Sequence, residues 1–552
     1  MRDRKLSPEG QGARPSAAAD GDTGDSRGDS RSDNEKRLDE LAFRRSQARQ
    51  MGGEDAVARQ HAAGRLTVRE RISRVTDAGS FREIGSLAGS GHYDEGNALT
   101  GSTPAPYVGG IARIGARPAA IGGEDFTVRG GTTFGSQRRK GGQGGFIEDF
   151  AFHYRIPLVN LIDGAGGTVT SIKKRGHTTF PGVHGFERSV SLMGRVPVAA
   201  AVLGSAAGGP AGRAILSHFS VMTRETSQVF AAGPPVVKRS LGQTIDKVDL
   251  GGAKVAVDQA GTIHNAAESE EDALDQVRSF LSFMPSNVWE MPPTQPTADP
   301  VDRREDELAT IVPERRTQAY NMHRLVDLVV DRLSTFELQP SFGKAVITKL
   351  ARLNGYPIGV IANNPMVYGG AVDAKAARKQ IHFVDLCDTF HIPLVYLVDV
   401  PGFMVGPKAE QDATLREGMR AVYATAQVEV PTLTVVVRKC YGMAGMATCN
   451  KNDVDLKIAW PTGEWGSLPV EGGVAAAYRR EIQAAEDPAA KEKEIEAELR
   501  PYASPFRTAE AFAVEEIIDP RETRPVLCEF IELAQRRLAA NLGPRRRSGV
   551  QP

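Results

Sequence analysis

Two glycine-rich turns, each at the end of an apolar stretch, are the residues of this chain best suited to chemistry. In the later turn, the β-branched residues 434–437 lead through residues 438–441 into Gly442, Met443 and Ala444. The apolar run is typical of a strand buried on both faces. At a strand-to-helix turn, unpaired backbone N–H groups can bind an oxygen that becomes negative during a reaction. A purely structural turn of small residues is the alternative interpretation.

The earlier turn repeats this pattern. Residues 196–203 are apolar and lead into Gly208 and Gly209. Because the following residue, Pro210, has no N–H, a pair of oxyanion-binding donors in this turn must come from Gly208 and Gly209. The candidate catalytic residues are therefore Gly208, Gly209, Gly442, Met443 and Ala444.

Three strand motifs occur twice in the chain, in the same order and at nearly the same separation. The pairs are Pro118 with Pro357, Asp163 with Asp399 and Pro197 with Pro431. Chance similarity would scatter the separations, so the motifs predict a duplicated domain.

The elements that position the turns alternate between strand and helix. Strands are predicted over residues 109–114, 117–121 and 158–163, with a helix over residues 145–154. This alternation indicates βαβ units around a largely parallel sheet, so the fold class is α/β. Gly166 and Gly167 follow the third of these strands, at the edge where open α/β sheets bind ligands. Neither a dinucleotide fingerprint nor a phosphate loop occurs there.

Basic residues near these elements are candidates for binding the phosphates of an extended ligand. Lys173 and Lys174 lie in the basic segment 171–177, and Arg65 lies in segment 64–72, which carries a capping-box signature. Arginine suits phosphate because its guanidinium group binds two oxygens at once. A solvated surface is the alternative interpretation of these charges.

Composition excludes several classes of protein. The 552 residues are 41% hydrophobic and 25% charged, with a formal net charge of zero. This is typical of a large globular protein and argues against nucleic acid or an anionic membrane as the main partner. The four cysteines form no Cys-x-x-Cys pair, and the ten histidines show no metal-ligand spacing, so no metal site is predicted.

The predicted organisation is two domains with flanking tails. The segments are a disordered tail (1–34), a first domain (35–291), a Pro-rich and charged linker (292–318), a second domain (319–542) and a basic tail (543–552). The apolar runs are too short to cross a membrane, and no secretory signal is recognised. We therefore expect a cytoplasmic location.

Over residues 35–538, the chain resembles the carboxyltransferase subunits of biotin-dependent acyl-CoA carboxylases, of the propionyl-CoA carboxylase β-chain type. The matching stretches are residues 64–72, 125–131, 236–238, 250–253, 398–403, 437–442 and 518–524. The most specific are Asp-Val-Pro-Gly-Phe at 399–403 and Arg-Lys-x-Tyr-Gly at 438–442.

This resemblance implies two homologous crotonase-like (ββα superhelix) halves, with the acyl-CoA side in the first half and the biotin side in the second. It implies acyl-CoA as the substrate and biotin carried on a separate chain. The implied partners are an α-subunit with biotin carboxylase and biotin carboxyl carrier domains, a small accessory subunit and further copies of this chain in a hexamer. Opposite halves of two subunits complete each site in the family. No Ala-Met-Lys-Met biotinylation site or ATP-binding domain occurs here, so partner chains are required.

The resemblance also assigns roles to the candidate residues. Gly208 and Gly209 would hold the thioester oxygen, and Met443 and Ala444, with Gly442, the ureido oxygen of biotin. The candidates for binding the substrate are Gly166, Gly167, Arg65, Lys173 and Lys174, together with Met446 at the position that selects the acyl chain.

The chain departs from the family pattern close to these residues. The turn at 163–169 lacks the arginine of the family, and Pro210 and Met443 stand where the family has other residues. Two further functions therefore stay open. One is a decarboxylase subunit that uses the same fold in reverse, and the other is a catalytically silent assembly partner.

Overall fold

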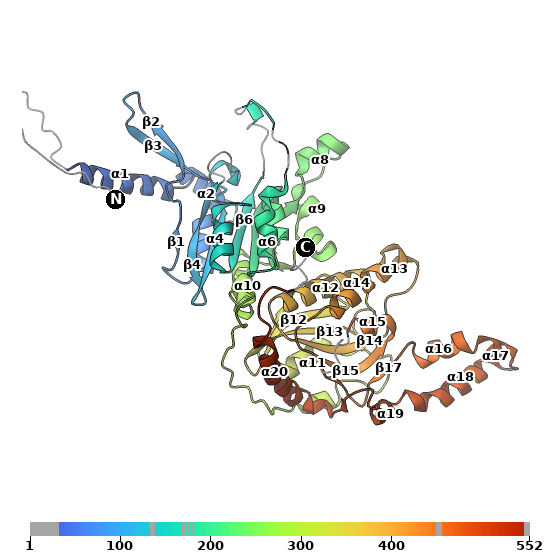
Figure 1. The fold of residues 1–552 in the computed structure, drawn as a ribbon. Helices are drawn as coiled ribbons and strands as arrows, with labels where there is room; N and C mark the ends of the chain where they lie inside the picture. Colours follow the sequence, from blue (N-terminus) through green and yellow to red (C-terminus); the bar gives the residue numbers. More distant parts are fainter. Residues whose placement is uncertain are drawn as a thin grey trace, which may run out of the picture.

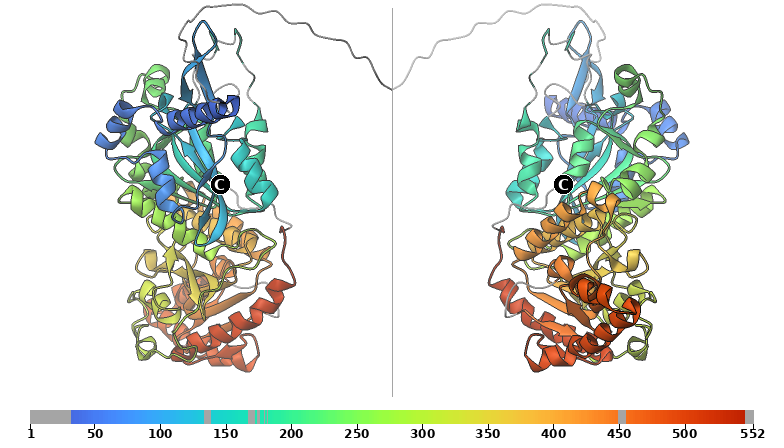
Figure 2. Two further views of the ribbon diagram at one scale, coloured as in Figure 1. Left: turned by 90° about the vertical axis from the view of Figure 1, so that its left-hand side faces the viewer. Right: turned by 90° about the vertical axis from the view of Figure 1, so that its right-hand side faces the viewer.

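Two eight-stranded sheets, one in each half of the chain, form the centre of the computed structural model (Figure 1). The structure describes residues 32–132, 139–166, 172–173, 176–178, 180, 182–448 and 455–545. The two halves are stacked, with the second half below the first in both side views of Figure 2.

The strands of the two sheets follow the same order. The first sheet runs β1 (Arg82–Glu83), β4 (Tyr107–Ile114), β5 (Arg117–Glu124), β6 (Leu158–Gly164), β7 (Val198–Ala207), β8 (Phe219–Thr223) and β10 (Asn265–Ala267), with β9 (Gln228–Phe230) beside β7. The second runs β11 (Phe336–Glu337), β12 (Val346–Leu353), β13 (Tyr356–Asn363), β14 (Leu394–Val400), β15 (Thr432–Tyr441), β16 (Lys457–Ala459) and β18 (Glu516–Ile517), with β17 (Glu464–Gly466) beside β15.

Strand register confirms the predicted duplication. Leu158 pairs with Ala120 in the first sheet, and Leu394, its counterpart in the repeated motif, pairs with Gly359 in the second. The register then shifts at equivalent places, between β6 and β7 and between β14 and β15. Asp163 and Asp399 therefore occupy the same irregularity in the two halves. From β5 and β13 onwards the strands are parallel, whereas the first three strands of each sheet are antiparallel.

Helices pack around the sheets or project from them (Figure 1). In the first half they are α1 (Asp33–Arg49), α2 (Glu54–Ala62), α3 (Val68–Val75), α4 (Phe146–Tyr154), α6 (Glu187–Leu192), α7 (Gly209–Ile215), α8 (Pro234–Leu241), α9 (Lys247–Gly251) and α10 (Glu270–Phe283). In the second half they are α11 (Met322–Val329), α12 (Ala374–Thr389), α13 (Pro407–Gln411), α14 (Thr414–Ala426), α15 (Gly442–Met446), α16 (Val470–Ala477), α17 (Arg479–Ala484), α18 (Pro488–Leu499), α19 (Pro505–Glu510) and α20 (Thr523–Ala539).

Local signals in the sequence account for several of these elements. Helix α4 is the helix predicted over residues 145–154. At the start of α3, the N–H of Thr67 donates to Glu70 at 2.7 Å and the N–H of Glu70 donates to the Thr67 hydroxyl at 3.3 Å. These two bonds confirm the capping box. The predicted buried strand is β15, in which only Lys439 is more than slightly exposed.

Two elements project from the body of the molecule. Strands β2 (Gly89–Tyr93) and β3 (Leu99–Pro104) form a hairpin that extends from the first half, and α16 to α18 form an arm on the second half (Figure 1). At the C-terminal end, Arg545 lies in the predicted basic tail but packs closely. Its side chain is 5% exposed, and its Nε donates to the carbonyl oxygen of Asp388 at 2.8 Å.

Three buried histidines are expected to make stability fall on acidification. Burial lowers the pKa of His218 to about 3 and that of His391 to about 4, and it holds the pKa of His264 well below its usual value. The unfolded chain then binds more protons than the folded chain between about pH 6.5 and pH 4. Each histidine therefore contributes stability that is full above its unfolded pKa and is lost at up to about 1.4 kcal/mol per pH unit below it.

Urea unfolding at pH 7 and pH 5 measures this loss. The His218→Gln variant should lose less stability between the two pH values than the unmodified chain, because Gln does not titrate. His92→Gln, a change at an exposed position, is the control and should keep the full loss. Equal losses in the chain and in His218→Gln would contradict the expectation.

Candidate active site

The first glycine turn joins β7 to α7 in a conformation that favours glycine. Gly208 has φ 60° and ψ −124°, which side-chain-bearing residues rarely adopt. The N–H of Gly212 donates to the carbonyl oxygen of Gly208 at 2.9 Å, so the hydrogen-bonding ladder of the helix starts there. The N–H groups of Gly209 and Ala211 precede that bond and have no acceptor within the helix. The turn can therefore offer backbone donors to an oxygen.

Two further residues, Gly166 and Gln143, pack against this turn. A Cβ atom on Gly166 would lie 2.5 Å from the carbonyl oxygen of Ala207, so Gly166 packs directly against the turn. A Cβ atom on Gly209 would lie 2.3 Å from Nε2 and 2.7 Å from Oε1 of Gln143. The Gln143 amide is thus a polar group beside the predicted thioester site. Gln143 was not predicted, because it lies far from Gly209 along the chain and its only signal is a glycine-rich context.

The second glycine turn joins β15 to α15 at the equivalent position. Gly442 is the counterpart of Gly208 and has φ 61°. Ala444 is buried, whereas Met443 is 44% exposed and Met446 is 62% exposed. Met446 therefore does not fill the core of this chain. A Cβ atom on Gly445 would lie 2.9 Å from Sγ of Cys440, so a larger residue there would need local rearrangement.

A buried carboxylate lies behind the first turn. Asp163 accepts hydrogen bonds from Arg71 at 3.0 Å and from Arg65 and Gln60 at 3.3 Å each. Arg71 also binds both carboxylate oxygens of Glu270, at 2.6 and 2.7 Å. All of these donors come from α2, α3 or the loop between them. The first half thus receives the counter-ion of Asp163 from outside its sheet.

In the second half, the counter-ion of the equivalent aspartate comes from a strand of the same sheet. Arg438, on β15, lies 2.9 Å from Asp399, which also accepts the N–H of Lys439 at 3.2 Å. The position equivalent to Arg438 in the first half is Gly204, where a Cβ atom would lie 2.1 Å from Oδ1 of Asp163. Glycine at 204 therefore leaves room for Asp163, and the arginine has to come from elsewhere.

A second buried ion pair anchors α7 itself. Arg213 is 1% exposed, pairs with Glu124 at the end of β5, and donates to Oδ1 of Asn160 at 3.0 Å. Burial raises the pKa of Glu124, and the adjacent Arg213 guanidinium opposes that rise. Because Arg213 lies one helical turn after Gly209, this pair helps to hold the first turn against the sheet.

The predicted basic ligands have different surroundings. Arg65 is 16% exposed at its side chain, donates to Asp163 and stacks over the ring of Phe126 at 4.8 Å. Lys173 is exposed. Gly167 and Lys174 lie outside the described residues. The roles of these residues in binding the substrate stay predictions.

Known proteins are similar to this chain in sequence and in fold. Residues 59–548 match the carboxyl transferase domain. The chain is 35% identical to the "propionyl-CoA carboxylase, carboxyltransferase subunit" of Haloferax mediterranei, over 89% of this chain and 94% of that one. It is 34% identical to the mitochondrial propionyl-CoA carboxylase beta chain of Homo sapiens, over 86% and 87% of the two chains.

Two solved structures have a fold similar to that of this chain. Transcarboxylase 12S matches with a TM-score of 0.82 and 31% identity, over 92% of this chain and 96% of that one. A single-chain, multi-domain long-chain acyl-CoA carboxylase matches with a TM-score of 0.75 and 29% identity, over 90% of this chain and 48% of that one.

The fold and these matches thus define a carboxyltransferase of the crotonase-like class, as the resemblance in the sequence implies. The chain belongs to the carboxyl transferase domain family and is a biotin-dependent acyl-CoA carboxyltransferase subunit. Within the part of the chain that the structure describes, no helix combines the length and the apolar character needed to cross a membrane.

Proposed function

We propose that the chain transfers the carboxyl group of carboxybiotin, carried on a separate partner chain, to the α-carbon of an acyl-CoA. The observation that carries this proposal is the pair of equivalent turns, with φ 60° at Gly208 and 61° at Gly442, one in each half. A chain that must stabilise two oxygens, one on each reactant, needs two such turns.

The first turn suits the thioester. Removing a proton from the α-carbon places negative charge on the thioester oxygen, and fixed N–H dipoles stabilise that charge without reorganising. Gly208 and Gly209 are the proposed donors, and Gly166 and Gln143 shape the space beside them. Such donors are each worth about 3 to 4 kcal/mol in other enzymes.

The second turn suits the ureido oxygen of biotin. Gly442, Met443 and Ala444 lie in the first turn of α15. Backbone N–H groups at this position lack acceptors within the helix. A Cβ atom on Gly442 would lie 3.3 Å from the carbonyl oxygen of Ser467, so the turn favours a residue without a side chain. When bound, carboxybiotin would supply the carboxyl group as CO2, and the biotin that remains would take up the α-proton, so the scheme needs no protein carboxylate or histidine as the base.

We infer that the working form is an oligomer, a hexamer by analogy with the family. The two turns lie in different halves, and Met443 and Met446 stay exposed in the single chain. Other large apolar side chains of the second half are also exposed, notably Val405 at 83%, Met366 at 64% and Leu468 at 60%. Exposed apolar surface of this kind supports association with another chain.

A separate carrier chain is the other proposed partner. The chain spans only 48% of the single-chain, multi-domain long-chain acyl-CoA carboxylase that it resembles. The biotin carboxylase and carrier functions would therefore belong to an α-subunit. A small accessory subunit is a further proposed partner, on the resemblance to the family alone.

Met446 is expected to favour acyl groups larger than acetyl. Its side chain is flexible, 62% exposed and flanked by Gly445, and methionine repacks around chains of different shape. Discrimination should be only about 1 to 3 kcal/mol per methylene. Relative kcat/KM values for acetyl-, propionyl-, butyryl- and longer acyl-CoAs measure it. A sharp optimum at acetyl-CoA, or an unchanged profile in Met446→Asp, would contradict this expectation.

One assay tests the whole proposal and its alternatives. Labelled CO2 is followed from carboxybiotin into the panel of acyl-CoAs, and the malonyl-type products are then tested for release of CO2. Net incorporation supports the carboxyltransferase. Release without incorporation would indicate the decarboxylase, and neither reaction, in the presence of the carrier subunit, would indicate a silent assembly partner.

A further inference from the structure

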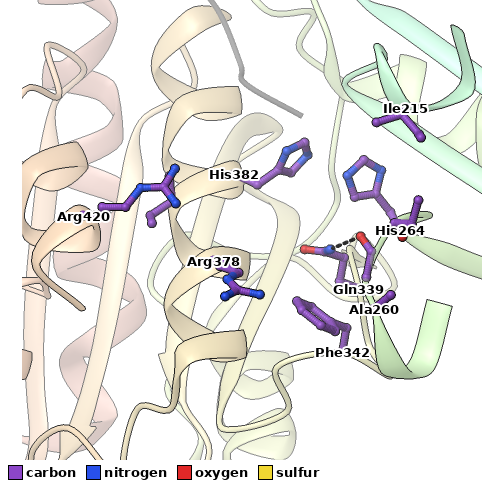
Figure 3. Close-up of a pocket in the computed structure, with 11 residues that line it drawn as sticks. Ile215, Ala260, His264, Gln339, Phe342, Arg378, His382 and Arg420 are labelled. Carbon is purple, nitrogen blue, oxygen red and sulfur yellow. Dashed lines mark hydrogen bonds between the residues drawn. The ribbon is translucent and has the colours of Figure 1, made fainter. Parts of the chain in front are cut away.

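A cavity of about 320 Å³ lies where the two halves of the chain meet. The first half contributes Ile215, at the end of α7, and residues 260–262 and 264 to its wall. The second half contributes the loop that contains Gln339 and Phe342, and side chains of α12 and α14 (Figure 3). None of the residues predicted for the active site lines this junction cavity.

The cavity wall carries excess positive charge. Arg378, on α12, and Arg420, on α14, line it and share one counter-ion, the buried carboxylate of Glu417. A third guanidinium, that of Arg416, lies 4.0 Å from the same carboxylate without lining the cavity. Three guanidinium groups thus lie within 4.0 Å of a single carboxylate.

The two lining arginines keep donors for a ligand. Arg420 donates to Glu417 at 2.9 Å, but the Arg378–Glu417 distance is 3.6 Å, which is too long for a hydrogen bond. Their side chains are 51% (Arg378) and 53% (Arg420) exposed. Each guanidinium group has five N–H donors, so most of them can still bind an anion.

A buried imidazole supplies one more donor. His264 is 7% exposed and lines the cavity, and its Nδ1 accepts the N–H of Ser220 at 2.9 Å. Burial and the neighbouring His382 ring, 4.3 Å away between centroids, keep the pKa of His264 well below its usual value. The ring is therefore neutral with its proton on Nε2. Among the described residues, Nε2 has no hydrogen-bond partner.

The rest of the wall is mixed: Thr262, Gln339 and His382 are polar, and three other large lining side chains are apolar. The rings and chains of Phe342, Ile381 and Ile215 line the same space. A volume of this size suits a small molecule, and few convergent polar groups in an apolar pocket are typical of ligand sites. A wall that combines basic groups with apolar side chains matches a small amphipathic anion.

We propose that the junction cavity binds a small organic anion, a carboxylate or a phosphate monoester. Its charged group contacts Arg378, Arg420 and Nε2 of His264, and its apolar part lies against Phe342 and Ile381. Because such a ligand touches both halves, it stabilises their junction. The site is separate from the two glycine turns, so the proposal does not depend on the assignment of the catalytic donors.

Calorimetric titration of the full chain with butyrate and with butyl phosphate tests the proposal. We expect saturable binding of at least one probe with a Kd of about 1 mM or tighter. The double variant Arg378→Gln/Arg420→Gln should bind at least about tenfold more weakly, because both charge-assisted contacts are lost. Thr262→Trp, which fills the cavity and keeps the charges, should weaken binding similarly.

Arg416→Gln is the matched control. It removes a guanidinium from the same carboxylate, but Arg416 is 76% exposed and does not line the cavity, so binding should be unchanged. Circular dichroism and elution volume establish that each variant is folded. Absence of saturable binding for both probes, or an equal loss in Arg416→Gln and the double variant, overturns the proposal. The preferred probe identifies the ligand as a carboxylate or a phosphate monoester.

Discussion

Replacing Gly209 with Val is expected to lower turnover by about 10²- to 10³-fold, the usual cost of losing one oxyanion donor. The added side chain would overlap the amide of Gln143, whose atoms lie 2.3 to 2.7 Å from the position of the new Cβ. Valine keeps the backbone N–H of residue 209, so the loss is expected to come from obstructed access to the turn. Because the overlapping atoms are the end of a flexible side chain, the fold can accommodate the change. Initial rates of labelled CO2 incorporation measure the effect.

Gly472→Val is the control for this substitution. Gly472 lies in α16, and a Cβ atom there would have no neighbour within 4 Å. This variant should keep its activity within about twofold, since exposed substitutions usually change stability by less than about 0.5 kcal/mol. If Gly209→Val loses folded structure and activity together, the glycine serves packing and the catalytic assignment is wrong.

Replacing Arg71 with Leu is expected to destabilise the chain by about 3 to 5 kcal/mol, which is the usual cost of breaking a buried ion pair by removing one partner. Arg71 is 1% exposed and pairs with both Asp163 and Glu270, so its loss leaves two buried carboxylates without their shared cation. Arg65 also pairs with Asp163, at 3.3 Å, and keeps part of the compensation. The midpoint of urea unfolding measures the loss.

Arg74→Leu provides a matched control on the same helix. Arg74 pairs with Glu271, the residue after Glu270, but this pair is about half exposed and 3.5 Å long. Exposed pairs contribute between about zero and 1 kcal/mol, so the unfolding midpoint should barely move. Similar losses in Arg71→Leu and Arg74→Leu would show that the buried network does not carry the stability assigned to it.

The features predicted well from the sequence are those with a local pattern. The duplication follows from three motif pairs at similar separations, and strand register places Asp163 and Asp399 at equivalent positions. The capping box of Thr67 and Glu70 is a short local signal and is confirmed. Both glycine turns occur where apolar strands end, because a chain that leaves a buried strand needs residues that permit a sharp change of direction.

The features that could not be predicted depend on distant residues. Gln143 reaches Gly209, and Arg71 reaches Glu270, across long stretches of sequence, and no local pattern links the two members of either pair. The hairpin of β2 and β3 was also missed, since its strands are short and largely polar or exposed. Only the folded sheet brings these groups together, so the pattern of a single segment does not reveal them.

The distance along the chain between each buried aspartate, Asp163 or Asp399, and its arginine partner affects how the chain folds during synthesis. Asp399 meets Arg438 only 39 residues later, within one strand-helix-strand unit. In the first half, Arg71 contacts Asp163 after 92 residues and Glu270 after 199. Closing a longer loop costs more entropy and slows folding. During synthesis, the first half therefore stays incomplete until α10 emerges, whereas the second half can close its charge pair soon after its central strands appear.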